Sequence, residues 1–126
     1  MNDYVSNNKH NIINKMPWGY YIPHSLSDTY QVKEIYLANK DDGFSYHFHK
    51  LVDEIWYIKK GKVRVFIEEF QEDVDEGAVF LIPKRSRHSL INIGISEVII
   101  IETQIGIIDN NDVYRLKDKY GRSELL

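Results

Sequence analysis

The stretch GFSYHFHKLVDEIWYIKKG, residues 43–61, decides the fold class, because β-like runs and turn signals alternate within it. Two histidines stand two residues apart, His47 and His49, and Glu54 begins the apolar run that follows. Side chains two apart in a strand leave the same face of a sheet, so both histidines are expected to point the same way. Glu54 comes five residues after His49. That is enough chain to turn and to return the carboxylate to the same face.

Short β-like runs continue on both sides of this stretch. They are rich in Val, Ile, Tyr and Phe, and turn signals containing Gly, Asp, Asn or Pro separate them. The runs are residues 31–38, 44–49, 54–60, 62–70, 78–83, 88–93 and 97–104. This succession predicts an all-β fold of antiparallel strands that closes as a barrel or sandwich. Closure would bring His88, which follows Pro83 and begins one of the runs, toward the other three polar groups.

Both ends of the chain break the β pattern. Residues 1–16 are polar and rich in Asn, which predicts a flexible N-terminal arm, and residues 17–126 are expected to form one domain. Near the C-terminus, an Asn-Asn-Asp cap precedes apolar residues at helical spacing and then a glycine. One short helix over residues 112–120 is therefore predicted on the outside of the fold.

The composition argues against several classes of protein. The 126 residues include no cysteine, which excludes disulfides, thiolate metal sites and a cysteine nucleophile. The formal charge is −3, so no overall basic field attracts phosphate backbones and no nucleic-acid partner is expected. No apolar run approaches the roughly 20 residues of a membrane span, and the N-terminus lacks an apolar leader. A cytoplasmic protein without a membrane partner is the resulting expectation.

Four side chains form a candidate metal site: His47, His49, Glu54 and His88. Imidazoles and a carboxylate suit one divalent transition metal, with zinc as the first expectation and Mn, Fe, Co or Ni also compatible, whereas Mg and Ca prefer oxygen. Four protein ligands leave positions of an octahedral ion open to water or substrate. Taken alone, a His-x-His on a strand is more often a hydrogen-bonded or exposed pair, so the wider pattern has to carry the prediction.

That wider pattern resembles the two motifs of the cupin superfamily. They read Gly43-x3-His47-x-His49-x4-Glu54-x6-Gly61 and Gly77-x5-Pro83-x4-His88-x3-Asn92. The resemblance implies a cupin fold, the double-stranded β-helix or jelly-roll barrel, with the three histidines and the glutamate as metal ligands. Two turn positions depart from the usual pattern. Three residues rather than five separate Gly43 from His47, and Arg85 stands where glycine is usual.

A closer resemblance is to the cupin module of type II mannose-6-phosphate isomerases, which is often fused to mannose-1-phosphate guanylyltransferases. It rests on the stretches PWGYY, SYHFHKLVDEIW, IPKRSRH, IETQIG and DVYRLKDKYGR. The resemblance implies metal-assisted interconversion of an aldose phosphate and a ketose phosphate in carbohydrate or nucleotide-sugar metabolism. His47 and Val52 stand where the family commonly has Gln and Arg.

An isomerase of this type needs a base to move a proton and cations to hold the phosphate of its sugar-phosphate substrate. Glu102 follows an apolar run, and burial would raise its pKa toward a useful value. The candidates for phosphate contact are Lys33, Lys84, Arg87 and Arg115.

Two other functions remain open. The same ligands suit an Fe(II) dioxygenase, in which the open positions take oxygen and substrate. A sugar-binding cupin without catalysis would keep the fold and the metal.

A homodimer is expected to form through sheet edges covered by residues 1–30, which contain Tyr, Ile and Trp.

Overall fold

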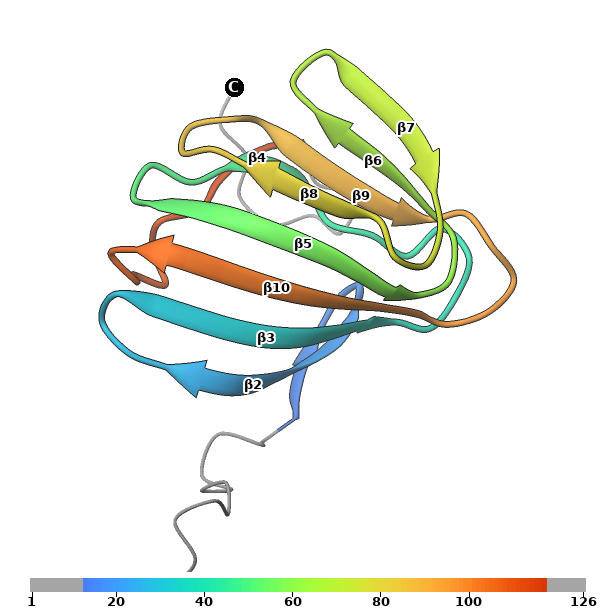
Figure 1. The fold of residues 1–126 in the computed structure, drawn as a ribbon, viewed down its shortest axis with the longest axis horizontal. Helices are drawn as coiled ribbons and strands as arrows, with labels where there is room; N and C mark the ends of the chain where they lie inside the picture. Colours follow the sequence, from blue (N-terminus) through green and yellow to red (C-terminus); the bar gives the residue numbers. More distant parts are fainter. Residues whose placement is uncertain (1–12, 118–126) are drawn as a thin grey trace, which may run out of the picture.

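The computed structural model describes residues 13–117, which form eleven β-strands in two sheets (Figure 1). The strands are β1 (Asn14–Met16), β2 (Gly19–Leu26), β3 (Tyr30–Leu37), β4 (Tyr46–Phe48), β5 (Val52–Lys60), β6 (Val63–Ile67), β7 (Phe70–Val74), β8 (Val79–Ile82), β9 (His88–Asn92), β10 (Val98–Gly106) and β11 (Tyr114–Lys117). The larger sheet has the order β1-β2-β3-β10-β5-β8, and the smaller has the order β11-β4-β9-β6-β7. Neighbouring strands are antiparallel, as expected for a jelly-roll barrel. Within the described residues there is no helix that could cross a membrane.

The all-β prediction is confirmed, and each of the seven predicted runs contains a strand. Four other segments also form strands, and one of them, β11, replaces the predicted helix. β2 was not predicted, because Pro23 interrupts the strand pattern of its sequence. In the structure, a register shift between Pro23 and Ser25 accommodates the proline. β7 was not predicted, because its sequence FQEDV contains charged residues that are uncommon in strands. The last residues of the predicted arm form β1, which pairs with β2, and residues 1–12 lie outside the described part.

The predicted helix over residues 112–120 is wrong where the structure describes it. Tyr114–Lys117 forms β11, which pairs with β4, and Tyr114 stacks on Phe48 with ring centroids 5.1 Å apart. Asp112, the expected helix cap, instead accepts hydrogen bonds from the backbone of residues 50 and 51. Tertiary pairing therefore overrides the helical spacing, and residues 118–120 lie outside the described residues.

The barrel interior has an apolar end and a polar end. Inward side chains alternate along each strand, and on β10 they change from Val98 and Ile100 to Glu102 and Gln104. The apolar end contains Trp18, Ile35, Leu37, Trp56, Ile58, Val63, Val65, Ile82, Leu90, Val98 and Ile100. Burying each such side chain stabilises the fold by about 1.5–3 kcal/mol. The polar end is where the histidines lie.

Two glycines allow neighbouring chain segments to approach closely. Gly19 has φ 147° and Gly106 has φ 144°, conformations that other residues rarely adopt. A Cβ atom at Gly19 would lie 2.1 Å from the carbonyl oxygen of Tyr36, and one at Gly106 would lie 2.1 Å from that of Leu51. These contacts explain the glycines of the PWGYY and IETQIG stretches.

Asn92, the last residue of the second motif, is fully buried at the apolar end. Its amide group donates to the carbonyl oxygens of Leu37 and Ser96, both at 3.1 Å, and its side-chain oxygen accepts from Gly94 N–H at 2.9 Å. The side chain therefore ties the β9–β10 turn to the end of β3.

Replacing Asn92 by Ala should lower the free energy of unfolding by about 1–3 kcal/mol, because two carbonyls and one amide lose their buried partner. Urea unfolding followed by circular dichroism measures this. The matched control is Asn39→Ala at an exposed position, where a change within about 0.5 kcal/mol is expected. Equal stability of both variants would contradict the role given to Asn92.

Candidate metal centre

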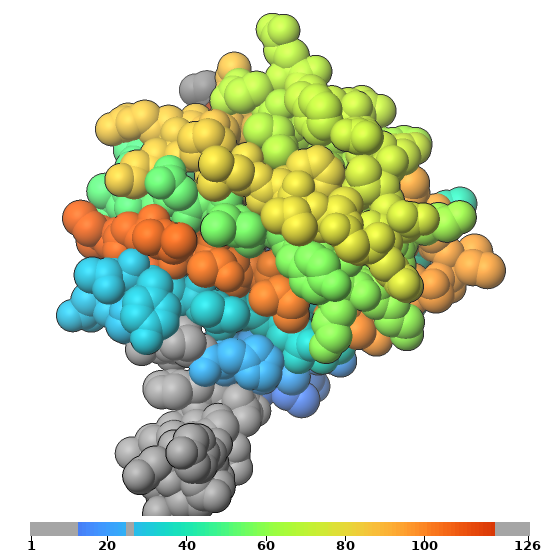
Figure 2. Space-filling view, viewed as in Figure 1, coloured from blue at the N-terminus to red at the C-terminus, as the bar shows by residue number. Residues whose placement is uncertain are grey.

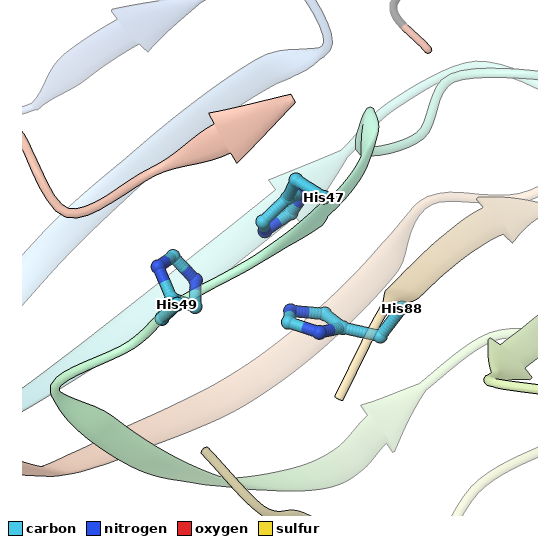
Figure 3. Close-up of side chains that lie close together, drawn as sticks. All are labelled: His47, His49 and His88. Atoms are coloured by element: carbon cyan, nitrogen blue, oxygen red, sulfur yellow. The ribbon is translucent and has the colours of Figure 1, made fainter. Parts of the chain in front are cut away.

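Strand register brings the three histidines together. His47 on β4 and His88 on β9 are direct cross-strand partners, and His49 follows immediately after β4. Their rings point toward one another in the barrel interior (Figure 3). One ligand nitrogen from each lies within 4.8 Å of the others. His49 and His88 are buried, and His47 is partly buried.

Each ring is oriented by a hydrogen bond between its Nδ1 atom and a backbone carbonyl. The partners are Ser45 for His47 at 2.7 Å, Asp112 for His49 at 2.6 Å and Ser86 for His88 at 2.8 Å. A carbonyl only accepts, so each Nδ1 carries a proton, and in the neutral form of each ring Nε2 presents a lone pair. This is the arrangement expected of metal-ligating histidines.

Glu54 completes the group from β5, and its position tests whether a cation fits. Its Oε1 atom lies 2.8 Å from Nε2 of His88 and 3.3 Å from Nε2 of His49. Nevertheless, Oε1 of Glu54 and Nε2 of His88 are buried and make no hydrogen bond. Two electron-rich atoms so close without a shared proton fit a cation bound between them. Three imidazole nitrogens and one carboxylate oxygen could thus hold a divalent transition metal.

The charges of the site displace the pKa values of its members. Burial, together with the neighbouring His88 and His49, lowers the pKa of His47 well below its usual value. Burial also lowers the pKa of His49, but the adjacent Glu54 carboxylate outweighs it and raises that pKa to about 9. Burial alone would raise the pKa of Glu54, but the two adjacent imidazoles hold it well below its usual range. Glu54 is therefore an anion aimed at the histidines.

Two further side chains on β10 support Glu54 and the cavity beside it. Gln104 donates to Oε2 of Glu54 at 3.1 Å, which leaves Oε1 facing the histidines, and Gln31 donates to Gln104 at 3.1 Å. Glu102 accepts from the indole N–H of Trp56 at 2.9 Å. Burial and the charge of Glu54 raise the pKa of Glu102 to about 8, although Lys33 and Trp56 oppose the shift.

Asp112 is the functional residue that the sequence patterns did not reveal. Its two carboxylate oxygens accept from the N–H groups of Lys50 at 2.9 Å and Leu51 at 3.0 Å, while its own carbonyl orients His49. It thus fixes the turn between His49 and Glu54. The available signal was its place at the start of the DVYRLKDKYGR stretch, where it resembled a helix cap.

A cavity of about 250 Å³ opens beside the histidines. Of the residues predicted from the sequence, it is lined by His47, His49, Glu102, Lys33 and Arg115. Val52, at the position where related modules commonly have Arg, also lines it.

Two predicted phosphate contacts do not line this cavity. Arg87 lies on the surface, where its guanidinium pairs with Glu68 at 2.8 Å. Lys84 is exposed, in the turn after β8, and its backbone N–H donates to Asp53. The structure does not bring Lys84 and Arg87 together with Glu102 and Arg115, because the turn that carries them faces outward.

The arrangement of the strands gives this chain the fold of a cupin. A solved RmlC-like cupin from Shewanella frigidimarina superposes with a TM-score of 0.72 over 87% of this chain and 96% of its own, at 14% identity. The capsular polysaccharide assembling protein CapF of Staphylococcus aureus superposes with a TM-score of 0.73 over 85% of this chain and 34% of its own, at 19% identity. Identities this low show a shared fold alone.

Sequence comparison assigns the chain to a more specific family. The chain belongs to the mannose-6-phosphate isomerase C-terminal family, whose model matches residues 2–118. It is 33% identical over 107 residues to mannose-1-phosphate guanylyltransferase of Escherichia coli K12, a match that covers 84% of this chain and 22% of that protein. The chain therefore spans about a fifth of the length of the curated relatives it matches.

Removal of a predicted ligand provides the direct test of the metal centre. His49→Ala and His88→Ala should each weaken divalent metal binding by more than the roughly 10–100-fold typical of a lost supporting residue. Elemental analysis of the purified protein and calorimetric titration with Zn²⁺ measure this. His24→Ala is the control, since His24 pairs with Glu34 on another face. Full metal occupancy in the His49 and His88 variants would rule out the site.

Asp112→Ala should weaken metal binding by roughly 10–100-fold although residue 112 keeps its carbonyl, because the turn that carries His49 loses its anchor. The same change should lower stability by about 1–3 kcal/mol, since two amides lose their acceptor. Asp28→Ala is the matched control at an exposed position. Unchanged Zn²⁺ affinity in Asp112→Ala would show that the turn does not depend on this carboxylate.

Proposed function

We propose that the protein is a metal-dependent aldose–ketose isomerase acting on a sugar phosphate. The observation that carries this proposal is one cavity lined by two of the metal-site histidines, His47 and His49, together with the buried carboxyl of Glu102 and the cations Lys33 and Arg115. The family name supports it, since the model that the chain matches describes the C-terminal part of mannose-6-phosphate isomerase. We infer that the protein acts in sugar-phosphate metabolism in the cytoplasm.

Isomerisation moves a proton from one substrate carbon to its neighbour, so the site needs a group that both accepts and returns a proton. Glu102 has a pKa of about 8 and lines the cavity, which suits this task near neutral pH. His47, His49, Glu54 and His88 would hold the metal, zinc being our first expectation. When bound there, a divalent ion would polarise the substrate's carbonyl or hydroxyl oxygen. Trp56 fixes the carboxyl of Glu102 by its hydrogen bond of 2.9 Å.

The phosphate would contact Lys33 and Arg115. Lys33 is held with its ammonium 4.5 Å from the ring centroid of Tyr21, so it is positioned at the cavity wall. Arg115 enters from β11, and its planar guanidinium suits a phosphate. Among the described residues that line the cavity, with valine at position 52, Lys33 and Arg115 are the lysine and the arginine, and these two would carry the recognition.

The test is a screen of hexose and heptose phosphates for aldose–ketose exchange by NMR, with the metal-loaded protein. Glu102→Gln should lower kcat by roughly 10²–10⁴-fold while metal remains bound. Arg115→Ala should mainly raise KM, and Arg64→Ala, an exposed arginine paired with Asp73, is the control for a lost surface charge.

Two experimental outcomes would contradict the isomerase proposal and support another function. Turnover that requires Fe(II) and oxygen would identify a dioxygenase. Sugar-phosphate binding without exchange of any substrate would identify a binding protein that lacks catalysis.

A further inference from the structure

Two rows of inward-facing side chains cross β3, β10 and β5 at the wall of the cavity. In the first row, Gln104 is the register partner of both Gln31 and Glu54, and in the second row Glu102 is the register partner of Lys33. Figure 1 shows the three strands side by side, and Figure 2 shows their outer face in cyan, orange and green, the face opposite to these rows. Gln31 lines the cavity, but the proposed function gives it no task.

The carboxylate of Glu54 fixes the direction in which the two amides of the first row point. A carboxylate only accepts, so Gln104 turns its Nε2 atom toward Glu54, at 3.1 Å. The Oε1 atom of Gln104 then faces Gln31 and accepts from Nε2 of Gln31 at 3.1 Å. This leaves Oε1 of Gln31 as an acceptor to which no group in the described part of the chain donates.

This unused acceptor belongs to a buried side chain at the cavity wall. Gln31 is only 6% exposed. A buried polar atom without a partner costs free energy, so such an atom is normally completed by water or by a bound ligand. A carbonyl oxygen takes a hydrogen bond from a hydroxyl, whereas phosphate oxygens are themselves acceptors. The chemistry of this atom therefore favours a ligand hydroxyl over a ligand phosphate.

The place of Gln31 in the rows indicates which part of a substrate it would meet. Neighbouring strands are about 4.8 Å apart, so roughly 10 Å separates Gln31 from Glu54 along the first row. On β3, Gln31 and Lys33 are two residues apart on the same face, roughly 7 Å along the strand. Gln31 is thus nearer to the proposed phosphate contact than to the metal centre, where the reacting carbons would lie.

We propose that Gln31 is a specificity-determining residue, whose Oε1 atom accepts a hydrogen bond from a substrate hydroxyl near the phosphate end of the sugar. This inference rests on the proposed function, because it takes the cavity to hold a sugar phosphate. The two amides of the first row then have separate tasks, since Gln104 holds the metal ligand Glu54 and Gln31 contacts the sugar. A site built to bind a hydroxyl rejects analogues that lack it, because its own polar group is then left unpaired.

The test uses two ligands that bind without reacting. D-mannitol 1-phosphate has no carbonyl and carries a hydroxyl on every carbon except the phosphorylated one, whereas hexyl phosphate has the same chain length and no hydroxyl. In calorimetry with the Zn²⁺-loaded protein, Gln31→Met should raise the Kd of D-mannitol 1-phosphate roughly 3–10-fold, the effect of one neutral hydrogen bond. It should leave the Kd of hexyl phosphate within about twofold. Gln71→Met, at an exposed position on β7, is the control and should change neither Kd.

Zn²⁺ titration separates the two amides. Gln104→Met should weaken Zn²⁺ binding roughly 10–100-fold because Glu54 loses its donor, and Gln31→Met should weaken it less than about threefold. Circular dichroism verifies that the variants fold.

Three results would overturn the role of Gln31: no binding of D-mannitol 1-phosphate by the unchanged protein, an unchanged Kd in Gln31→Met, or an equal rise for both ligands. If the NMR screen finds no exchange while Gln31→Met still weakens D-mannitol 1-phosphate alone, the proposed function fails and the role of Gln31 in binding stands.

Discussion

The three imidazole rings are held by hydrogen bonds that use up their Nδ1 protons, and the rest of the site follows from this constraint. With Nδ1 committed to backbone carbonyls, three Nε2 lone pairs and the carboxylate of Glu54 face one small interior space. Burying an anion and several acceptors together costs free energy unless a positive charge is shared among them. The arrangement therefore favours coordination of a cation at the expense of the stability of the barrel.

Cross-strand pairing explains why this polar cluster is orderly. His47 is the register partner of His88, so two ligands are opposed by the sheet itself. On β10, Gln104 is the register partner of Glu54, and Glu102 is that of Trp56. In both pairs the hydrogen bond joins the same two residues that the register opposes. The support of Glu54 and Glu102 is thus a consequence of strand register, whereas the three imidazole rings are oriented by carbonyls that lie outside the strands.

Features that depend on the two-residue repeat of a strand could be predicted from the sequence. Contacts between residues far apart in the chain could not. His47 and His49 were predictable because side chains alternate in a strand. Asp112 was not, because its partners lie about sixty residues away and its surroundings also fit a helix cap. The structure also explains the residue that is usual at position 85. The φ of Arg85 is 70°, in the left-handed region, which explains why glycine is usual at this motif position. Likewise, a Cβ atom at Gly43 would lie 2.3 Å from the carbonyl oxygen of Leu90.

The same strands line the cavity with one face and expose apolar side chains on the other. Along β5, Glu54 and Trp56 point inward while Ile55 and Tyr57 point outward, and β10 repeats this alternation. Neither surface shares a side chain with the other. Substitutions on the outward face of these strands can therefore leave the ligands in place.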